Sequence, residues 1–211
     1  MLKLWGRMSS INVQKVAWTL GELNLAHEQV DVGGRFGGLD SPEFLARNPH
    51  GRIPVIDDDG TTVWESNAIV RYLCARYSPD GLWPSSAAAR AKSDQWMEWS
   101  ATSLQPAFME FFWSWYRTPA TMRDEERNAA LLARAHSAFA ALEPVLAGAD
   151  LGRLTMADIP IGSLLYRYFT LEIARPPLPR LEAWYAKLGG RPAYRESVMR
   201  PYDELKGRLA F

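Results

Sequence analysis

The sequence predicts an α/β N-terminal domain followed by an all-α C-terminal domain. Short β-rich segments alternate with helical segments through roughly the first 80 residues. A segment rich in turn residues comes next, and after it the apolar residues recur at helical spacing only. A chain of 211 residues is long enough for one large domain or two small ones, and it buries a core without disulfides or metals.

The expected N-terminal elements follow the order strand, helix, strand, helix, strand, strand, helix. Leu2–Trp5 is the first strand, and the helix after it has apolar residues on one face from Val13 to Leu20. The later elements are a strand at Glu28–Val32, a glycine-rich loop at Gly33–Gly38, a helix opening at Ser41–Arg47, strands at Ile53–Ile56 and Thr61–Trp64, and a helix at Ser66–Tyr77.

This order of elements determines the expected sheet. A strand, a helix and a second strand at the start imply a right-handed crossover and parallel pairing. The turn at Asp57–Gly60 makes a hairpin of the last two strands, which adds antiparallel pairing. Four strands in a mixed sheet with helices on both faces form the thioredoxin-like architecture, which we expect for residues 1–78.

Residues 79–86 are expected to form a linker, and residues 87–211 an all-α helical bundle. Thr155 and Asp158 suggest a capping box at the start of one helix, with Leu154 and Ile159 as its hydrophobic staple. The other expected helices are Ala87–Trp115, kinked at Pro106, then Arg123–Leu146, Leu178–Leu188 and Pro192–Arg200.

Composition narrows the class of function. The 24 Lys and Arg balance the 24 Asp and Glu, so nothing in the net charge favours nucleic acid or an anionic membrane as a partner. One cysteine excludes an intrachain disulfide and a CxxC redox pair, and the three histidines lack metal-ligand spacing, so we expect no metal. The first residues lack the apolar run of a signal peptide, and no stretch reaches about 18 apolar residues, so we expect a cytoplasmic protein without a membrane span.

Four short motifs occur in order within residues 1–170: SSINVQKV at 9–16, NPHGRIPVI at 48–56, WESNAI at 64–69 and TMAD at 155–158. They resemble the serine loop and first helix, the NPxGxxP segment, the acid-Ser-x-x-Ile motif and the capping box of the cytosolic glutathione transferases. The second and third together are the most specific. The WGR start and the GGRFGG loop resemble a bacterial, theta/beta-neighbouring branch of serine-type members.

The resemblance implies a role for Ser10. In serine-type relatives the residue that activates the glutathione thiol lies six positions before a helix valine, and counting back from Val16 gives Ser10. A hydroxyl at the start of a helix, where the dipole is positive, can donate to a thiolate. Ser9 is the alternative donor and Asn12 a possible second one. The competing interpretation is that Ser10 or Asn12 only caps the helix.

The same resemblance implies the residues that hold glutathione. Glu65 suits the ammonium of its γ-glutamyl end, and the Ser66 hydroxyl and N–H suit the carboxylate. Ile53 and Pro54 are expected to be joined by a cis peptide bond, with Ile53 pairing with the cysteinyl backbone of the peptide. Arg52 matches a position where relatives place a polar or basic side chain for the peptide. Simple capping remains the alternative for Glu65 and Ser66, and a surface position for Arg52.

The second substrate is expected to be a small apolar electrophile. Phe108 and Phe112 share a helix face in a segment that borders the electrophile pocket in this fold, and Met8 in the serine loop faces the same pocket. Arg117 suits an acidic electrophile. Core packing is the alternative for each aromatic residue, and Cys74 is expected to be a buried inert thiol.

The expected function is therefore that of a glutathione transferase, a homodimeric detoxification enzyme with glutathione as co-substrate. Two alternatives stay open: a non-catalytic interaction module of the same fold, and a glutathione-dependent isomerase or dehalogenase.

Overall fold

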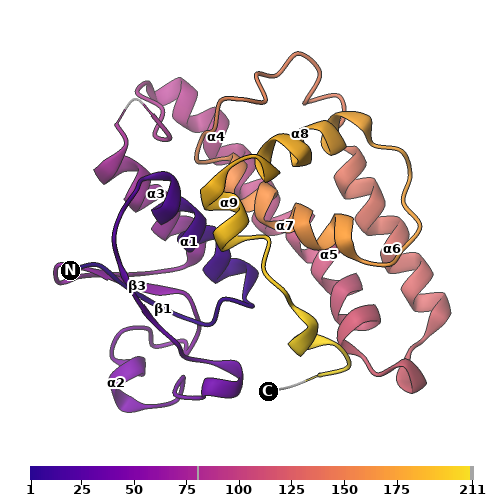
Figure 1. Ribbon diagram of the computed structural model, residues 1–211, viewed down its shortest axis with the longest axis horizontal. Helices are drawn as coiled ribbons and strands as arrows, with labels where there is room; N and C mark the ends of the chain where they lie inside the picture. The colour runs from indigo at the N-terminus through magenta and orange to yellow at the C-terminus, as the bar shows by residue number, and fades with distance from the viewer. Residues whose placement is uncertain (80, 210–211) are drawn as a thin grey trace.

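The computed structural model describes residues 1–79 and 81–209 (Figure 1). Its N-terminal part contains a four-stranded sheet in the order β2-β1-β3-β4. β1 (Lys3–Trp5) pairs in parallel with β2 (Glu28–Val30) and antiparallel with β3 (Val55–Asp58), which pairs antiparallel with β4 (Thr61–Trp64). The mixed thioredoxin-like sheet that the sequence predicts is confirmed.

Helices cover both faces of this sheet. α1 (Ile11–Glu22) and α3 (Ser66–Tyr77) pack on one face, in a core that includes Leu4 and Ile56. The short α2 (Pro42–Leu45) covers the other face, where Phe44 packs with Trp5 and Val55. Ser41 caps α2 as expected, since its hydroxyl accepts from the Phe44 N–H over 3.2 Å. Within the expected loop after β2, residues Gly34–Phe36 form a 3₁₀ turn, η1.

The β3–β4 hairpin is tighter than predicted. β3 begins at Val55 instead of Ile53 and continues through Asp58, so the turn contains only Asp59 and Gly60. Both turn residues have positive φ, 50° and 92°, which suits a two-residue hairpin turn. Asp58 tolerates a buried strand position because its carboxylate accepts hydrogen bonds from Tyr72 and Tyr77 at 2.8 and 2.7 Å.

The described part of the C-terminal half is helical. Its first long helix is assembled from α4 (Ala87–Trp99), the π-helical η2 (Ser100–Leu104), α5 (Gln105–Phe111) and the π-helical η3 (Phe112–Arg117). Pro106 lies in the first turn of α5, directly after the wider η2, so its missing N–H falls where the helical ladder already changes. The remaining elements are η4 (Ala120–Met122), α6 (Glu125–Ala140), α7 (Asp158–Thr170), α8 (Pro179–Gly189), α9 (Pro192–Ser197) and η5 (Asp203–Leu205).

Two predicted helices were too long. The one expected to reach Leu146 ends at Ala140, and turns follow through Pro144, which cannot donate to a helical ladder. The one expected to reach Arg200 ends at Ser197.

The predicted capping box is half correct: Asp158 accepts from the Thr155 N–H and hydroxyl, at 2.6 and 2.8 Å, but the hydroxyl of Thr155 donates rather than caps.

α1 joins the two halves, and in Figure 1 it lies between the sheet and helices α7 and α9. Its Trp18 is fully buried and meets the Tyr194 ring edge-on, with centroids 4.8 Å apart. A Cβ at Gly162 of α7 would lie 2.8 Å from the Trp18 ring, so only glycine permits this approach. Arg191 donates two hydrogen bonds to Glu22, at 2.8 and 2.7 Å.

Candidate functional site

The loop between β1 and α1 presents the predicted Ser10 at the start of a helix. Ser10 occupies the N-cap position, with φ −89° and ψ 122°, but its hydroxyl caps no backbone N–H of α1. The side chain is half-buried. A hydroxyl in this position is available as a donor to an anion at the positive end of the α1 dipole. The capping interpretation of Ser10 is therefore unsupported.

The neighbouring Ser9 is engaged with the protein. Its side chain is 8% exposed, and its hydroxyl accepts a weak hydrogen bond from Arg7 Nη1 over 3.4 Å. Its backbone carbonyl accepts from Nη2 of Arg167, in α7, over 2.6 Å. Ser9 thus anchors the loop, while Ser10 carries the hydroxyl without a capping partner.

Asn12 contacts the C-terminal half. Its Oδ1 accepts from Gln105 Nε2 over 3.1 Å, and Gln105 Oε1 accepts from Lys15 Nζ over 2.6 Å. Gln105 therefore orients two side chains of α1. Because the Asn12 oxygen is occupied, its amide nitrogen is the group left to donate to a ligand.

The segment before β3 is organised by Asn48. This side chain is 2% exposed, donates to the Arg52 carbonyl over 2.8 Å and accepts from the His50 N–H over 3.0 Å. The Ile53–Pro54 peptide bond is cis, as expected. Pairing with β1 begins only at Val55, so the N–H and C=O of Ile53 lie outside the sheet ladder. The Arg52 side chain is exposed.

Glu65 and Ser66 lie at the junction of β4 and α3. Glu65 has φ 68°, a backbone conformation that is costly for a residue with a side chain and that concentrates at functional sites. It is exposed, whereas Ser66 is 7% exposed and is the first residue of α3. An acidic side chain, a hydroxyl and a helix N-terminus are thus grouped at one point.

These two residues line a cavity of about 370 Å³ between the N-terminal half and the long C-terminal helix. Asn12 and Lys15 of α1 line it as well, and Gln105 closes it from α5. The other lining residues are Asn67, Ala68, Arg71, Glu98 and Ala101. Ser10, Arg52, Ile53 and Pro54 are not among them. The structure thus gathers Glu65 and Ser66 with three polar residues of α1 and α5.

The electrostatic environment of the Ser9–Ser10 loop is positive. Arg167 is 2% exposed, and burial, with a smaller effect from the charges of Arg7 and Arg117, lowers its pKa to about 9. Since that pKa is still well above 7, Arg167 carries its charge at neutral pH. A guanidinium beside the loop favours an anion at Ser10.

The predicted electrophile residues occupy the core instead. Phe108 and Phe112 are fully buried in the main hydrophobic cluster, so neither side chain borders an open pocket, and this expectation is corrected. Their shared helix face was right, but α6 and α7 cover that face: Phe139 and Tyr168 both pack against Phe108. Met8 is half-buried beside the sheet core.

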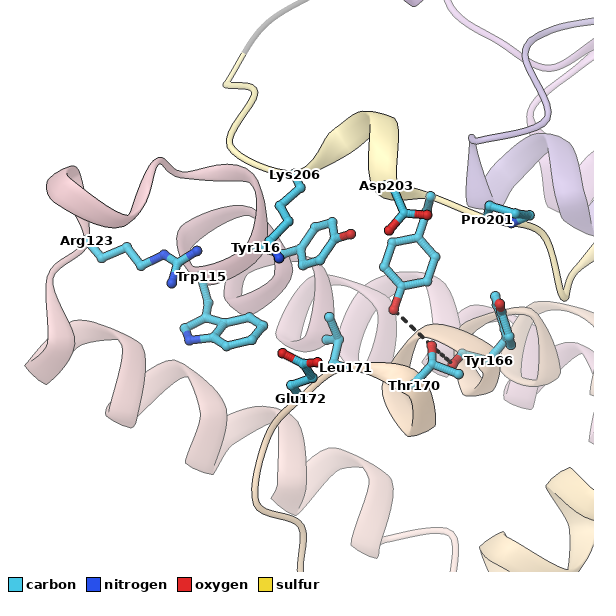
Figure 2. A pocket seen from close by; sticks show the side chains of 11 residues that line it. Trp115, Tyr116, Arg123, Tyr166, Thr170, Leu171, Glu172, Pro201, Asp203 and Lys206 are labelled. Atoms are coloured by element: carbon cyan, nitrogen blue, oxygen red, sulfur yellow. Dashed lines mark hydrogen bonds between the residues drawn. The ribbon is translucent and has the colours of Figure 1, made fainter.

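A second cavity, of about 410 Å³, lies in the C-terminal half (Figure 2). Its aromatic lining consists of Trp115, Tyr116, Tyr166 and Tyr202, and Asp203 and Lys206 reach it from the C-terminal segment. Phe112 supports this wall from behind, since its ring stacks on Tyr116 with centroids 5.0 Å apart.

The cavity is connected with the serine loop through Arg167. The ring of Tyr202 lies 5.2 Å from the guanidinium carbon of Arg167, whose Nη2 holds the Ser9 carbonyl. Arg117 ends η3 and donates from Nε to the Arg208 carbonyl over 2.8 Å.

Several site residues were missed by the sequence analysis. The sequence position of Lys15 could have revealed it, because a lysine between Ile11 and Trp18 lies on the apolar face of a helix. Arg167 could have been found in the same way, as the single arginine of the apolar α7. No sequence pattern pointed to Gln105. Cys74 is buried as predicted, and burial raises the pKa of its thiol to about 12.

Within the described ranges, no helix has the length and apolar character needed to cross a membrane. In the same part of the chain, no three His, Cys, Asp or Glu side chains gather where they would hold a metal ion.

Comparisons with known proteins show the family of this chain. A family model for the N-terminal domain of glutathione S-transferases matches residues 4–81. The chain is 40% identical to glutathione S-transferase GstB of Escherichia coli strain K12, over 95% of this chain and 99% of that protein. It is 31% identical to glutathione S-transferase 3 of Zea mays, over 93% of each. The crystal structure of a theta class glutathione S-transferase from Xanthomonas axonopodis pv. citri, with glutathione bound, superposes with a TM-score of 0.89 at 42% identity, over 95% of this chain and 98% of that one.

Proposed function

Because the chain belongs to the glutathione S-transferase family, we propose that it transfers the glutathione thiolate to a small electrophile, with Ser10 as the thiolate donor. The observation that carries this assignment is the Ser10 hydroxyl, which stands at the N-terminus of α1 and caps no backbone N–H. Ser9, the alternative donor, has its hydroxyl and its carbonyl in contact with arginines.

The chemical task is to keep the sulfur ionised near neutral pH. A free cysteine thiol has a pKa of about 8.5, so only a few per cent is thiolate at pH 7. Lowering that pKa by about two units requires roughly 2.7 kcal/mol of preference for the thiolate. The Ser10 hydroxyl, the positive end of α1 and the charge of Arg167 supply it together, and the sulfur then attacks the electrophile.

Glutathione is held by the groups at the two junctions of the sheet. The γ-glutamyl ammonium pairs with Glu65, and its carboxylate accepts from the hydroxyl and N–H of Ser66. The N–H and C=O of Ile53, next to Pro54, pair with the cysteinyl backbone. Arg52 lies beside the same peptide. The strained backbone of Glu65 supports a ligand-binding role for this junction.

The electrophile site of the proposal is the aromatic cavity of Figure 2. Its rings suit an apolar or aromatic electrophile. The guanidinium of Arg167 contacts both the ring of Tyr202, which lines the cavity, and the Ser9 carbonyl of the serine loop. We extend the proposal to a cytoplasmic detoxification enzyme that acts as a homodimer, on the ground of the family alone.

Titration of bound glutathione tests the role of Ser10. The thiolate absorbs in the ultraviolet, so the pKa of the bound thiol is measured directly in the wild type and in Ser10→Ala, Ser9→Ala and Asn12→Ala. Ser10→Ala should raise it by roughly one unit and lower turnover about ten- to thirtyfold, with little change in glutathione affinity. An unchanged pKa in Ser10→Ala, with a shift in Ser9→Ala or Asn12→Ala, would move the role to that residue.

A panel of aryl halides, epoxides and haloacids tests the reaction itself. Retention on immobilised glutathione with turnover of at least one of these electrophiles is the expected result. Retention without turnover of any of them would favour the non-catalytic interaction module.

A further inference from the structure

Lys15 is a buried lysine that has no role in the proposed reaction. It lies in the middle of α1, and its side chain is 2% exposed. Lysine is almost never buried to this extent unless it is paired. Its hydrogen-bond partner is the neutral Oε1 of Gln105, at 2.6 Å. Among the residues that the structure describes, no carboxylate lies within ion-pair distance of Lys15.

The place of this lysine points to a ligand. Lys15 lines the same cavity as Glu65 and Ser66, and Gln105 borders it from the other side. The lysine therefore lies at the inner wall of the site assigned to the γ-glutamyl end of glutathione. That end carries one ammonium and one carboxylate on the same carbon. Glu65 suits the ammonium, and the carboxylate then lies in a cavity with a buried cation in its wall.

We propose that Lys15 is a further glutathione-binding residue, whose ammonium pairs with the α-carboxylate of the γ-glutamyl end. This inference rests on the proposed function, because it assigns a residue to the same ligand. In the free protein, Gln105 holds the lysine ready by accepting one of its three N–H bonds. In the complex the carboxylate supplies the anion that the buried ammonium lacks.

The lowered pKa of Lys15 is consistent with a buried ammonium that has no paired anion in the free protein. Burial lowers its pKa to about 7, against a smaller opposing effect of Glu65. The other charged groups that line the cavity are Arg71 of α3 and Glu98 of α4, which pair with each other. A carboxylate bound beside Lys15 raises that pKa again. Ligand binding above pH 7 is therefore expected to draw a proton from solution.

Two glutathione analogues, each lacking one charged group of the γ-glutamyl end, distinguish carboxylate binding by Lys15 from a structural role of Lys15. In 4-aminobutyryl-cysteinyl-glycine the α-carboxylate of glutathione is missing and the amine is kept, whereas glutaryl-cysteinyl-glycine keeps the carboxylate and lacks the amine. Calorimetry with the wild type, Lys15→Met and the exposed control Lys187→Met measures the affinity for each peptide. Lys15→Met should weaken glutathione and the glutaryl peptide at least tenfold and leave the aminobutyryl peptide within about twofold. Lys187→Met should change none of them.

Equal weakening of all three peptides by Lys15→Met would overturn the inference, because it would show a structural effect. So would unchanged affinity for glutathione. If the wild type itself failed to bind glutathione, the proposed function would fail instead.

A measurement on the wild type alone covers the case in which Lys15→Met does not fold. S-methylglutathione has no thiol proton, so its binding at pH 8, in two buffers of different ionisation enthalpy, counts protons taken up by the protein. Uptake with S-methylglutathione, and none with the S-methylated aminobutyryl peptide, is the expected result. No uptake with either ligand would overturn the inference.

Discussion

The Nη2 atom of Arg167 donates a hydrogen bond to the backbone carbonyl oxygen of Ser9 over 2.6 Å. Arg167 belongs to α7 in the C-terminal half, and its guanidinium packs against the rings of Phe112 and Tyr202 at 5.0 and 5.2 Å. The position of the serine loop in the N-terminal half is therefore fixed by a buried charge of the other half. Since the next residue is Ser10, the placement of the proposed thiolate donor depends on this contact.

Arg167→Gln should impair chemistry more than glutathione binding. The variant removes both a charge-assisted hydrogen bond, worth about 1.5–3 kcal/mol, and a positive charge beside the serine loop. We expect a higher pKa of the bound thiol and a lower kcat, with the glutathione Kd within about threefold. The control is Arg195→Gln, which removes an exposed arginine that donates to the Gly189 carbonyl over 2.9 Å. An unchanged thiol pKa in Arg167→Gln would show that Arg167 has only a structural role.

Glu65→Gln and Ser66→Ala should each weaken glutathione binding about ten- to hundredfold, at a cost of ~1.5–3 kcal/mol for a lost charge-assisted hydrogen bond. Glu65 is exposed, so its effect should be at the low end and should shrink as salt is added. Ser66 is buried, and its effect should depend little on salt. Calorimetry at low and high ionic strength measures both, with the distant Glu110→Gln as control. Equal salt dependence would contradict the assigned contacts.

The pH dependence of folding stability should report on Lys15. Its pKa of about 7 in the folded protein lies below the roughly 10.4 of an exposed lysine. Between these values the unfolded chain binds more protons than the folded one, so raising the pH favours the folded state. Relative to Lys15→Met, the wild type should gain stability from pH 7 to pH 10, as measured by urea unfolding. Parallel curves for the two proteins would show that Lys15 is not buried as described.

Cys74→Ser should leave turnover within about twofold of the wild type. The thiol is fully buried and its raised pKa keeps it protonated, so it offers no thiolate for chemistry. Burying a hydroxyl in this apolar place should lower stability by about 1–3 kcal/mol. A thiol reagent should react with the wild type only after unfolding. Loss of turnover at an unchanged melting temperature would assign a functional role to Cys74.

The elements that the sequence predicted well are those decided by neighbouring residues. The Asp59-Gly60 turn, the Ser41 cap and the helix from Ser66 to Tyr77 depend on local chemistry. The helix has its predicted bounds, whereas the turn and the helix after Ser41 are shorter than predicted. The position of Ser10 at a helix N-terminus was predictable for the same reason.

The contacts that complete the site join distant positions. Lys15 and Gln105 are 90 positions apart, and Ser9 and Arg167 are 158 apart. Such pairs depend on how α1 packs against the C-terminal helices, which no local pattern encodes. Phe108 and Phe112 show the same limit: helical spacing put them on one face, but it did not determine whether a cavity or another helix covers that face.

The approach of Trp18 to Gly162 restricts how the two halves can be recombined. A fragment cut near residue 78 would leave Trp18 and Ile11 of α1, with Val70 and Cys74 of α3, facing water, because they share one hydrophobic cluster with the C-terminal helices. A helical half transplanted from a relative would need both a glycine opposite Trp18 and a cation to meet Glu22. The two halves are thus modular in chain order but not in folding, and they are expected to diverge during evolution as a matched pair.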